Sequence, residues 1–194
     1  MTDKNICFCD DDTDVEELKQ ILLSRNKEWI KVKNGSNSIN DSLKTIVLSC
    51  VDSRVPVEKI FNAKPGELLV LKNAGNVITE DILRSLIVAI FELKAKFFIV
   101  LGHKRCGMSI LGNEEKIEHL SNELGDTLDK LKVKMGEDPL KWFKFFPEGK
   151  WVDNVHTQVN YIREILSELI DECHIPCIIP ALYDLDSGKV IFLD

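Results

Sequence analysis

Three side chains with chemical potential follow one apolar segment near the start of the chain. Cys50, Asp52 and Arg54 stand at alternate positions directly after the run Ile-Val-Leu at 46–48. Cys50 is a potential thiolate, and the guanidinium fork of Arg54 suits bidentate binding of the Asp52 carboxylate. The pattern Cys-x-Asp-x-Arg is weak by itself, so its meaning depends on whether other segments supply partners for the sulfur.

His103 and Cys106 are the partners that the sequence offers, after a second apolar run at 97–101. If the two runs form adjacent parallel strands, about 5 Å apart, Cys50 and His103 lie at one edge of the sheet. His103 and Cys106, three residues apart at an expected helix start, then share one face. Two thiolates and one imidazole suit tetrahedral zinc with a fourth position open, which is the catalytic pattern. Each residue alone would more simply be a packing or hydrogen-bonding residue, and the combination favours a metal site.

The elements that position these groups follow from the apolar pattern. Short apolar runs predict strands at 45–50, 68–72, 97–101, 177–183 and 189–193, the last two as a hairpin. Helical spacing predicts helices at about 13–30, 57–61, 79–94 and 153–173. A further helix is predicted to open at 102–108, and its apolar residues recur at helical spacing through 131. The alternation predicts an α/β fold: a mostly parallel central sheet of about four parallel strands plus an antiparallel edge strand, flanked by helices.

Length and composition predict one globular domain. The chain has 194 residues, 44% hydrophobic and 29% charged, which is enough for a single sizeable core. We expect one domain over 1–194, with 1–12 as a flexible tail. The net charge of −7 would repel a phosphate backbone, so no nucleic-acid partner is expected.

The sequence also indicates a cytoplasmic location. No apolar run is long enough to span a bilayer, and the first residues lack the pattern of a signal peptide, so no membrane partner is expected. In a reducing compartment the six cysteines are metal ligands, catalytic groups or free thiols rather than disulfides. Cys7 and Cys9 are expected to be free thiols, and so are Cys173 and Cys177, in preference to a second metal site with His174.

Three segments together resemble the β-class carbonic anhydrases. They are Cys-Val-Asp-Ser-Arg at 50–54, Asn-Ala-Gly-Asn at 73–76 and Gly-His-Lys-Arg-Cys-Gly-Met at 102–108. The motifs occur in the family's order and near its spacing, within about 44–110. The chain is most similar in kind to the shorter microbial and archaeal members.

The resemblance implies an activity and a role for each residue. Cys50, His103 and Cys106 would bind the cofactor Zn²⁺, and Asp52 with Arg54 would orient the zinc-bound hydroxide that attacks carbon dioxide. The enzyme would be a carbonate dehydratase, a zinc lyase that reversibly hydrates CO2 to bicarbonate and a proton. Family members generally form dimers or multiples of dimers, so a homo-oligomer is expected.

Ser53 and Gly107 are candidate substrate-binding residues. Backbone N–H groups near Gly107, at the expected helix start, would bind the bicarbonate anion. This segment also departs from the family, because Lys104 and Arg105 stand where many relatives have Thr or Ser followed by an acidic or small residue. A more basic rim and altered surroundings for His103 are therefore expected.

The sequence leaves other functions open. A hydrolase of carbon disulfide or carbonyl sulfide on the same scaffold would use the same residues. A non-catalytic module that binds zinc or bicarbonate is also possible, although a structural zinc needs neither Asp52 nor Arg54. The aromatic connection at 136–151 is expected to pack on the core or a partner subunit rather than form a lid. His119 is expected to be a solvated or core residue rather than a proton shuttle.

Overall fold

The computed structural model describes residues 12–32, 43–136 and 138–194. The chain divides into two compact units, 1–37 and 38–194. The described part of the first unit is helix α1 (Asp12–Val32), whose side chains from 17 to 31 are all exposed. The predicted tail at 1–12 lies outside the described residues except for Asp12, which begins α1. The single domain over 1–194 stays a prediction.

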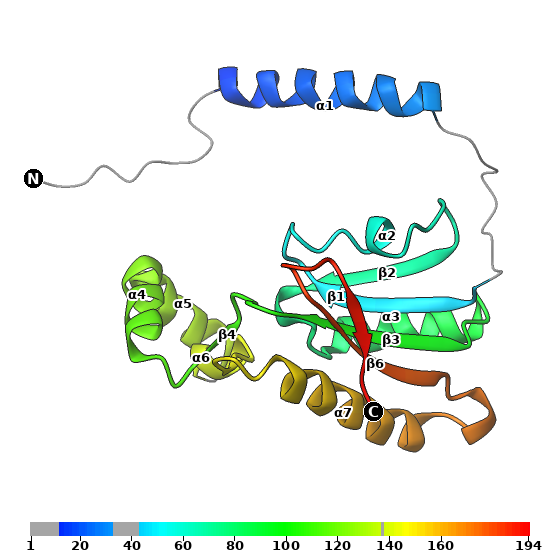
Figure 1. The fold of residues 1–194 in the computed structure, drawn as a ribbon. Coiled ribbons are helices and arrows are strands. Elements are labelled where there is room, and N and C mark those ends of the chain that lie inside the picture. Colours follow the sequence, from blue (N-terminus) through cyan, green and yellow to red (C-terminus); the bar gives the residue numbers. More distant parts are fainter. Residues whose placement is uncertain (1–11, 33–42, 137) are drawn as a thin grey trace, which may run out of the picture. The chain divides into compact units, whose positions relative to one another are not determined.

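The second unit is built on a five-stranded sheet in the order β2-β1-β3-β6-β7. Neighbouring strands are parallel from β2 (Leu68–Asn73) through β1 (Thr45–Cys50) and β3 (Phe97–His103) to β6 (Cys177–Tyr183). The edge strand β7 (Val190–Phe192) is antiparallel to β6 (Figure 1). The α/β prediction, with four parallel strands and an antiparallel edge, is confirmed.

Two long helices cover one face of this sheet. Helix α3 (Glu80–Phe91) begins after Thr79, whose hydroxyl accepts a hydrogen bond from the backbone N–H of Ile82. Helix α7 (Trp151–Leu169) packs on β3 and β6 (Figure 1). Buried side chains at helical spacing on both helices meet the central strands in the main core: Ile82, Leu86, Ala89 and Ile90 with Val155, Val159, Ile162 and Leu166.

A smaller apolar cluster lies on the other face of the sheet. It contains Val47, Ile99 and Leu101 from the central strands, and Val57 from the one-turn helix α2 (Val57–Ile60). Two short 3-10 turns complete the connections, η1 (Ala74–Asn76) and η2 (Glu172–His174). Of the helices in the described residues, none is both long and apolar enough to cross a membrane.

A lobe of short elements follows β3. It consists of α4 (Glu114–Leu124), α5 (Asp126–Met135) and α6 (Pro139–Trp142), with a two-stranded sheet of β4 (Ser109–Leu111) and β5 (Phe146–Pro147). The helical spacing predicted for 117–131 is present, but Gly125, at φ 46° and ψ −129°, divides it into two helices. The lobe extends beyond the carboxyl edge of the main sheet (Figure 1).

The prediction that 102–108 opens a helix is wrong. After β3 the chain makes a turn, in which the N–H of Lys104 donates to the carbonyl of Tyr183 on β6. Arg105 has a left-handed backbone, with φ 55°, which an α-helix does not tolerate. The helix starts only at Glu114, where the side chain of Asn113 accepts from the N–H of Lys116.

Gly102, the residue before His103, marks a close approach between β3 and α7. A Cβ at this position would lie 2.4 Å from Cγ2 of Val155. Val155 is fully buried and β-branched, so its side chain has little freedom to move aside. We expect Gly102→Ala to lower the free energy of unfolding by about 1–3 kcal/mol, measured by urea denaturation.

Gly107→Ala is the matched control, because nothing lies within 4 Å of a Cβ at that position. Its unfolding free energy should equal that of the wild type. Adding Val155→Ala to Gly102→Ala should remove the clash and leave only the cost of the lost methyl groups. Equal stability of Gly102→Ala and the wild type would contradict the contact.

Candidate metal centre

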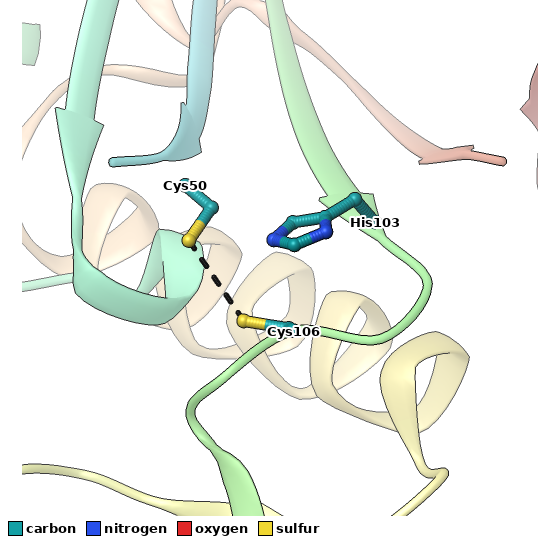
Figure 2. A group of neighbouring side chains, drawn as sticks. All are labelled: Cys50, His103 and Cys106. Atoms are coloured by element: carbon teal, nitrogen blue, oxygen red, sulfur yellow. Dashed lines mark hydrogen bonds between the residues drawn. The ribbon is translucent and has the colours of Figure 1, made fainter. Parts of the chain in front are cut away.

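Cys50, His103 and Cys106 lie together at the carboxyl edge of the sheet. Cys50 and His103 are the last residues of the adjacent parallel strands β1 and β3, and Cys106 returns to this edge on the following turn. Their ligand atoms all lie within 4.8 Å of one another, and no other such group of three occurs within the described ranges. Figure 2 shows both sulfur atoms and the imidazole ring turned toward one another.

The two thiols form a buried, strongly interacting pair. Cys50 and Cys106 are 3% and 5% exposed, and their sulfur atoms lie 3.8 Å apart, too far for a disulfide. The hydrogen bond from the Cys106 thiol lowers the pKa of Cys50 to about 4, against burial, which raises it. The same hydrogen bond, followed by burial, raises the pKa of Cys106 above its usual range. The pair therefore holds one negative charge readily and resists a second.

His103 is oriented by its own backbone. Nδ1 lies 2.9 Å from the carbonyl oxygen of Lys104. A carbonyl only accepts hydrogen bonds, so Nδ1 carries a proton, and in the neutral ring Nε2 presents the lone pair. Nε2 is buried without a hydrogen-bond partner. A buried nitrogen lone pair beside two thiols is the arrangement expected of a metal ligand.

Asp52 and Arg54 form a bidentate ion pair next to this group. Nε of Arg54 donates to Oδ1 of Asp52 at 2.9 Å and Nη2 donates to Oδ2 at 2.6 Å, while the backbone N–H of Arg54 also donates to Oδ1. These hydrogen bonds lower the pKa of Asp52 to about 2. Oδ2 lies 4.0 Å from Nε2 of His103. In this structure the carboxylate therefore rests on Arg54 and faces the three ligands without joining them.

A backbone turn on the other side of Cys50 completes its surroundings. Gly75, at φ 80°, donates its N–H to the sulfur of Cys50, and a Cβ there would lie 3.2 Å from Cβ of Met108. Asn154 on α7 holds the turn by donating to the Gly75 carbonyl at 3.1 Å. The sequence reasoning missed Asn154, although a polar residue on an apolar helix face was a signal for it.

A cavity of about 730 Å³ opens beside Cys106. Its wall is mostly apolar and comes from the turn after β3, from β4 and α4, and from the aromatic segment 143–151; it includes Met108, Ile110, Leu120, Phe143, Phe145 and Trp151. His119 is exposed, as expected, but it lines the same cavity, which the sequence did not reveal. Phe146 is buried against Cys50 and Cys106. The aromatic connection thus packs on the candidate site itself.

Ser53 and Gly107, the predicted substrate-binding residues, are placed differently with respect to the cavity. Ser53 and Gly107 are both exposed in turns, and Gly107 lines the cavity beside Cys106. The helix start invoked for Gly107 is absent, and the substrate contacts of both residues stay predictions.

The other cysteines lie apart from this group or outside the described residues. Cys173 and Cys177 are exposed free thiols, and the sulfur of Cys173 lies 3.4 Å from Nδ1 of His174. This pair gains no third ligand within the described residues. Cys7 and Cys9 lie outside the described residues.

The geometry predicts one metal ion per chain. We expect isothermal titration of the metal-free chain with Zn²⁺ to show a single tight site, with proton release because a thiol must ionise. Cys50→Ser and Cys106→Ser should each weaken binding by about 100-fold or more. Cys173→Ser and Cys177→Ser are the matched controls and should bind as the wild type does. Wild-type affinity in Cys50→Ser would exclude this site.

A family sequence model and individual curated relatives both relate this chain to carbonic anhydrases. The sequence model of the family described as "Carbonic anhydrase" matches residues 45–190. A carbon disulfide hydrolase of Acidianus sp. (strain A1-3) is 27% identical over 145 residues, which cover 71% of this chain and 66% of the relative. Beta-carbonic anhydrase 1 of Mycobacterium tuberculosis (strain ATCC 25618 / H37Rv) is 29% identical over 103 residues, or 53% of this chain and 63% of the relative. The match thus covers less than two thirds of each curated relative.

Solved structures show the same fold over nearly the whole chain. The β-carbonic anhydrase isoform I of Trichomonas vaginalis has a TM-score of 0.67 and 27% identity, covering 90% of this chain and 96% of that one. The family match alone spans most of the sequence and contains all three clustered ligands. The chain therefore belongs to the β-carbonic anhydrase family.

Proposed function

We propose that the protein is a zinc enzyme that reversibly hydrates carbon dioxide to bicarbonate and a proton. The observation that carries the proposal is the buried Cys50–His103–Cys106 group with a bidentate Asp52–Arg54 pair beside it. A structural metal site would need only the ligands. The adjacent carboxylate, held ionised and aimed at the ligand group, favours catalysis over a non-catalytic zinc or bicarbonate module.

The ligand group fits zinc. Two thiolates that each bind tetrahedral zinc at about 2.3 Å are separated by about 3.8 Å. The sulfur atoms of Cys50 and Cys106 are 3.8 Å apart. The unpartnered Nε2 of His103 supplies the third donor, and the suppressed ionisation of Cys106 is relieved by a cation. Three protein ligands leave a fourth position for reactants, as in catalytic zinc sites.

When bound, zinc would supply hydroxide as a nucleophile near neutral pH. Oδ2 of Asp52 lies 4.0 Å from Nε2 of His103, so the carboxylate faces the ligand group. From there Asp52 would accept a hydrogen bond from the nucleophile and fix its direction. Arg54 holds Asp52 ionised: the pKa of Asp52 lies near 2, below its ordinary 3.8. This stabilisation is present above the ordinary pKa and is lost only as pH falls toward 2. Asp52 thus acts as an acceptor throughout the neutral range.

The apolar cavity beside Cys106 suits a small neutral substrate. Carbon dioxide has no net dipole and enters an apolar passage at little cost in desolvation. We assign Ser53, exposed in the turn next to Asp52, and Gly107, exposed in the lining of the cavity, to contacts with the polar product.

Carbon disulfide or carbonyl sulfide hydrolysis is the second candidate. It is favoured by a specific observation, the 27% identity to a carbon disulfide hydrolase. Those substrates are also linear, neutral and apolar, so the same cavity and the same Asp52–Arg54 pair would serve them. Direct comparison of the substrates is needed to choose.

Two further expectations belong to the proposal. A homo-oligomer is supported by large apolar side chains exposed on the second unit, such as Leu169 and Phe192, which are 58% and 59% exposed. A cytoplasmic location is supported by the exposed free thiols of Cys173 and Cys177, since such thiols persist in a reducing compartment.

The test is stopped-flow hydration of CO2 by the zinc-loaded full-length chain, with carbon disulfide hydrolysis measured in parallel. We expect CO2 turnover that rises from about pH 6.5 toward alkaline pH, because two thiolates offset the charge of zinc and weaken its acidifying effect. A pH–rate profile already flat at about pH 6.5 would contradict this charge argument. Turnover of carbon disulfide without CO2 hydration would replace the first candidate with the second.

Asp52→Asn separates the acceptor role from metal binding. The amide keeps the shape of the carboxylate but loses its charge and one acceptor oxygen. We expect full zinc content, measured by atomic emission, and a hydration rate lowered roughly 10- to 100-fold. The control is Asp81→Asn, which breaks an exposed ion pair with Arg84 on α3 and should leave the rate unchanged. An unaltered rate in Asp52→Asn would refute the role.

A further inference from the structure

The loop between His103 and Cys106 is attached to the β6–β7 hairpin at consecutive residues. The backbone N–H of Lys104 donates to the carbonyl of Tyr183 at 3.1 Å, and its Nζ donates to Oδ2 of Asp184 at 2.9 Å. The side chain of Arg105 pairs with Asp186 in the same hairpin turn. Both side chains of the loop between His103 and Cys106 are therefore tied by ion pairs to the same hairpin.

The backbone carbonyls of the same two residues face inward and hold the site. The carbonyl of Lys104 accepts from Nδ1 of His103, which fixes the ring with Nε2 free. The carbonyl of Arg105 lies 3.3 Å from Nη2 of Arg54, the residue that holds Asp52. Each residue of this loop therefore joins an outer ion pair to an inner hydrogen bond.

The backbone of the loop needs external support. Arg105 has φ 55°, a left-handed conformation that is strained for a non-glycine residue. Such a conformation persists only where surrounding contacts hold it. Within the described structure, those contacts include the hairpin carboxylates and the guanidinium of Arg54.

We propose that Asp184, acting through Lys104, is a positioning residue that fixes His103 for metal binding. The ion pair immobilises the Lys104 peptide, whose carbonyl sets the orientation of the imidazole. Loss of the pair leaves the three ligands present but lets His103 turn away more often, so the metal leaves faster. This inference rests on the proposed metal site and concerns how that site is held.

The two ion pairs are not equivalent. The side chains of Lys104 and Asp184 are 36% and 17% exposed, whereas those of Arg105 and Asp186 are 56% and 70% exposed. Solvent-exposed pairs contribute little because water screens them and their side chains stay mobile. The Lys104–Asp184 pair should therefore carry most of the effect.

Asp184→Asn is a selective substitution because the two carboxylate oxygens of Asp184 face different partners. Its Oδ1 accepts from the backbone N–H of Asp186 within the turn, a bond that an asparagine oxygen can also make. The substitution removes the charge that faces Lys104 while keeping the turn. Lys104→Gln removes the same pair from the other side without touching the hairpin.

The experiment measures the rate at which the zinc-loaded full-length chain transfers zinc to an excess of a chromogenic chelator. We expect Asp184→Asn and Lys104→Gln each to release zinc about tenfold faster than the wild type, and the double variant to be no faster than either. Lys104→Arg, which keeps the cation, and Asp186→Asn should both stay within about twofold. The visible spectrum of the Co²⁺-loaded chain should change in Asp184→Asn, because a displaced imidazole alters the ligand field.

Controls separate positioning from general stability. Asp81→Asn should release zinc at the wild-type rate. If Asp184→Asn lowered the unfolding free energy of the metal-free chain but kept the wild-type release rate and Co²⁺ spectrum, the pair would be only structural and the inference would be overturned. A wild-type chain that binds no zinc would overturn the proposed function and this inference with it, whereas a zinc-binding, active wild type with unchanged variants overturns this inference alone.

Discussion

Parallel pairing of β1 with β3 is the constraint on which the site depends. The two strands contribute Cys50 and His103 from positions 53 residues apart in sequence, and only their adjacency places both side chains over one point. A parallel pair needs a crossover, which passes here through β2 and α3, and the packing of α3 on the sheet buries apolar side chains of the central strands. The energy that holds the ligands together is therefore mostly that of the core beneath them. Hydrogen bonds among the side chains of the site then orient groups whose backbone positions the core has already set.

The electrostatics of the site follow from the burial of two thiols and one imidazole close to one another. Two thiols in contact share one negative charge readily and resist a second, while His103 presents an unprotonated nitrogen. One cation bound by these three residues would relieve all three features and would give the buried Nε2 of His103 a partner. The Asp52 carboxylate would compete for the same cation if it were free. Its bidentate pair with Arg54 keeps it close and directed, but separate from the three ligands.

Support for the site extends outward through successive layers. Asn154 fixes the Gly75 turn, the Gly75 and Asp52 N–H groups donate to Cys50, and the Lys104 carbonyl fixes His103. The aromatic segment after α6 then closes the apolar side of the cavity. A connection of this composition would be a liability if it were exposed, and packing beside the ligands accounts for its residues.

The sequence by itself determined the elements whose signal is local. Apolar runs located β1 at 45–50 and β6 at 177–183, because buried parallel strands are continuous apolar segments. Thr79 and the amphipathic spacing located α3, and residue chemistry singled out the thiols and the imidazole. The turn at 102–108 was misread as a helix start, because its geometry depends on bonds to the hairpin and on a left-handed Arg105 that no local pattern reveals.

Only the tertiary structure decided the relations between distant segments. It brought Asp184 and Asp186 of the hairpin to the loop between His103 and Cys106. It also placed Asn154 within hydrogen-bonding distance of the Gly75 carbonyl. It also gave the cavity its wall from the lobe after β3, including His119. These contacts join residues up to 81 positions apart, and their partners are set by how helices pack on a finished sheet. The sequence states which groups can do the chemistry, and the packing of the core decides which of them meet.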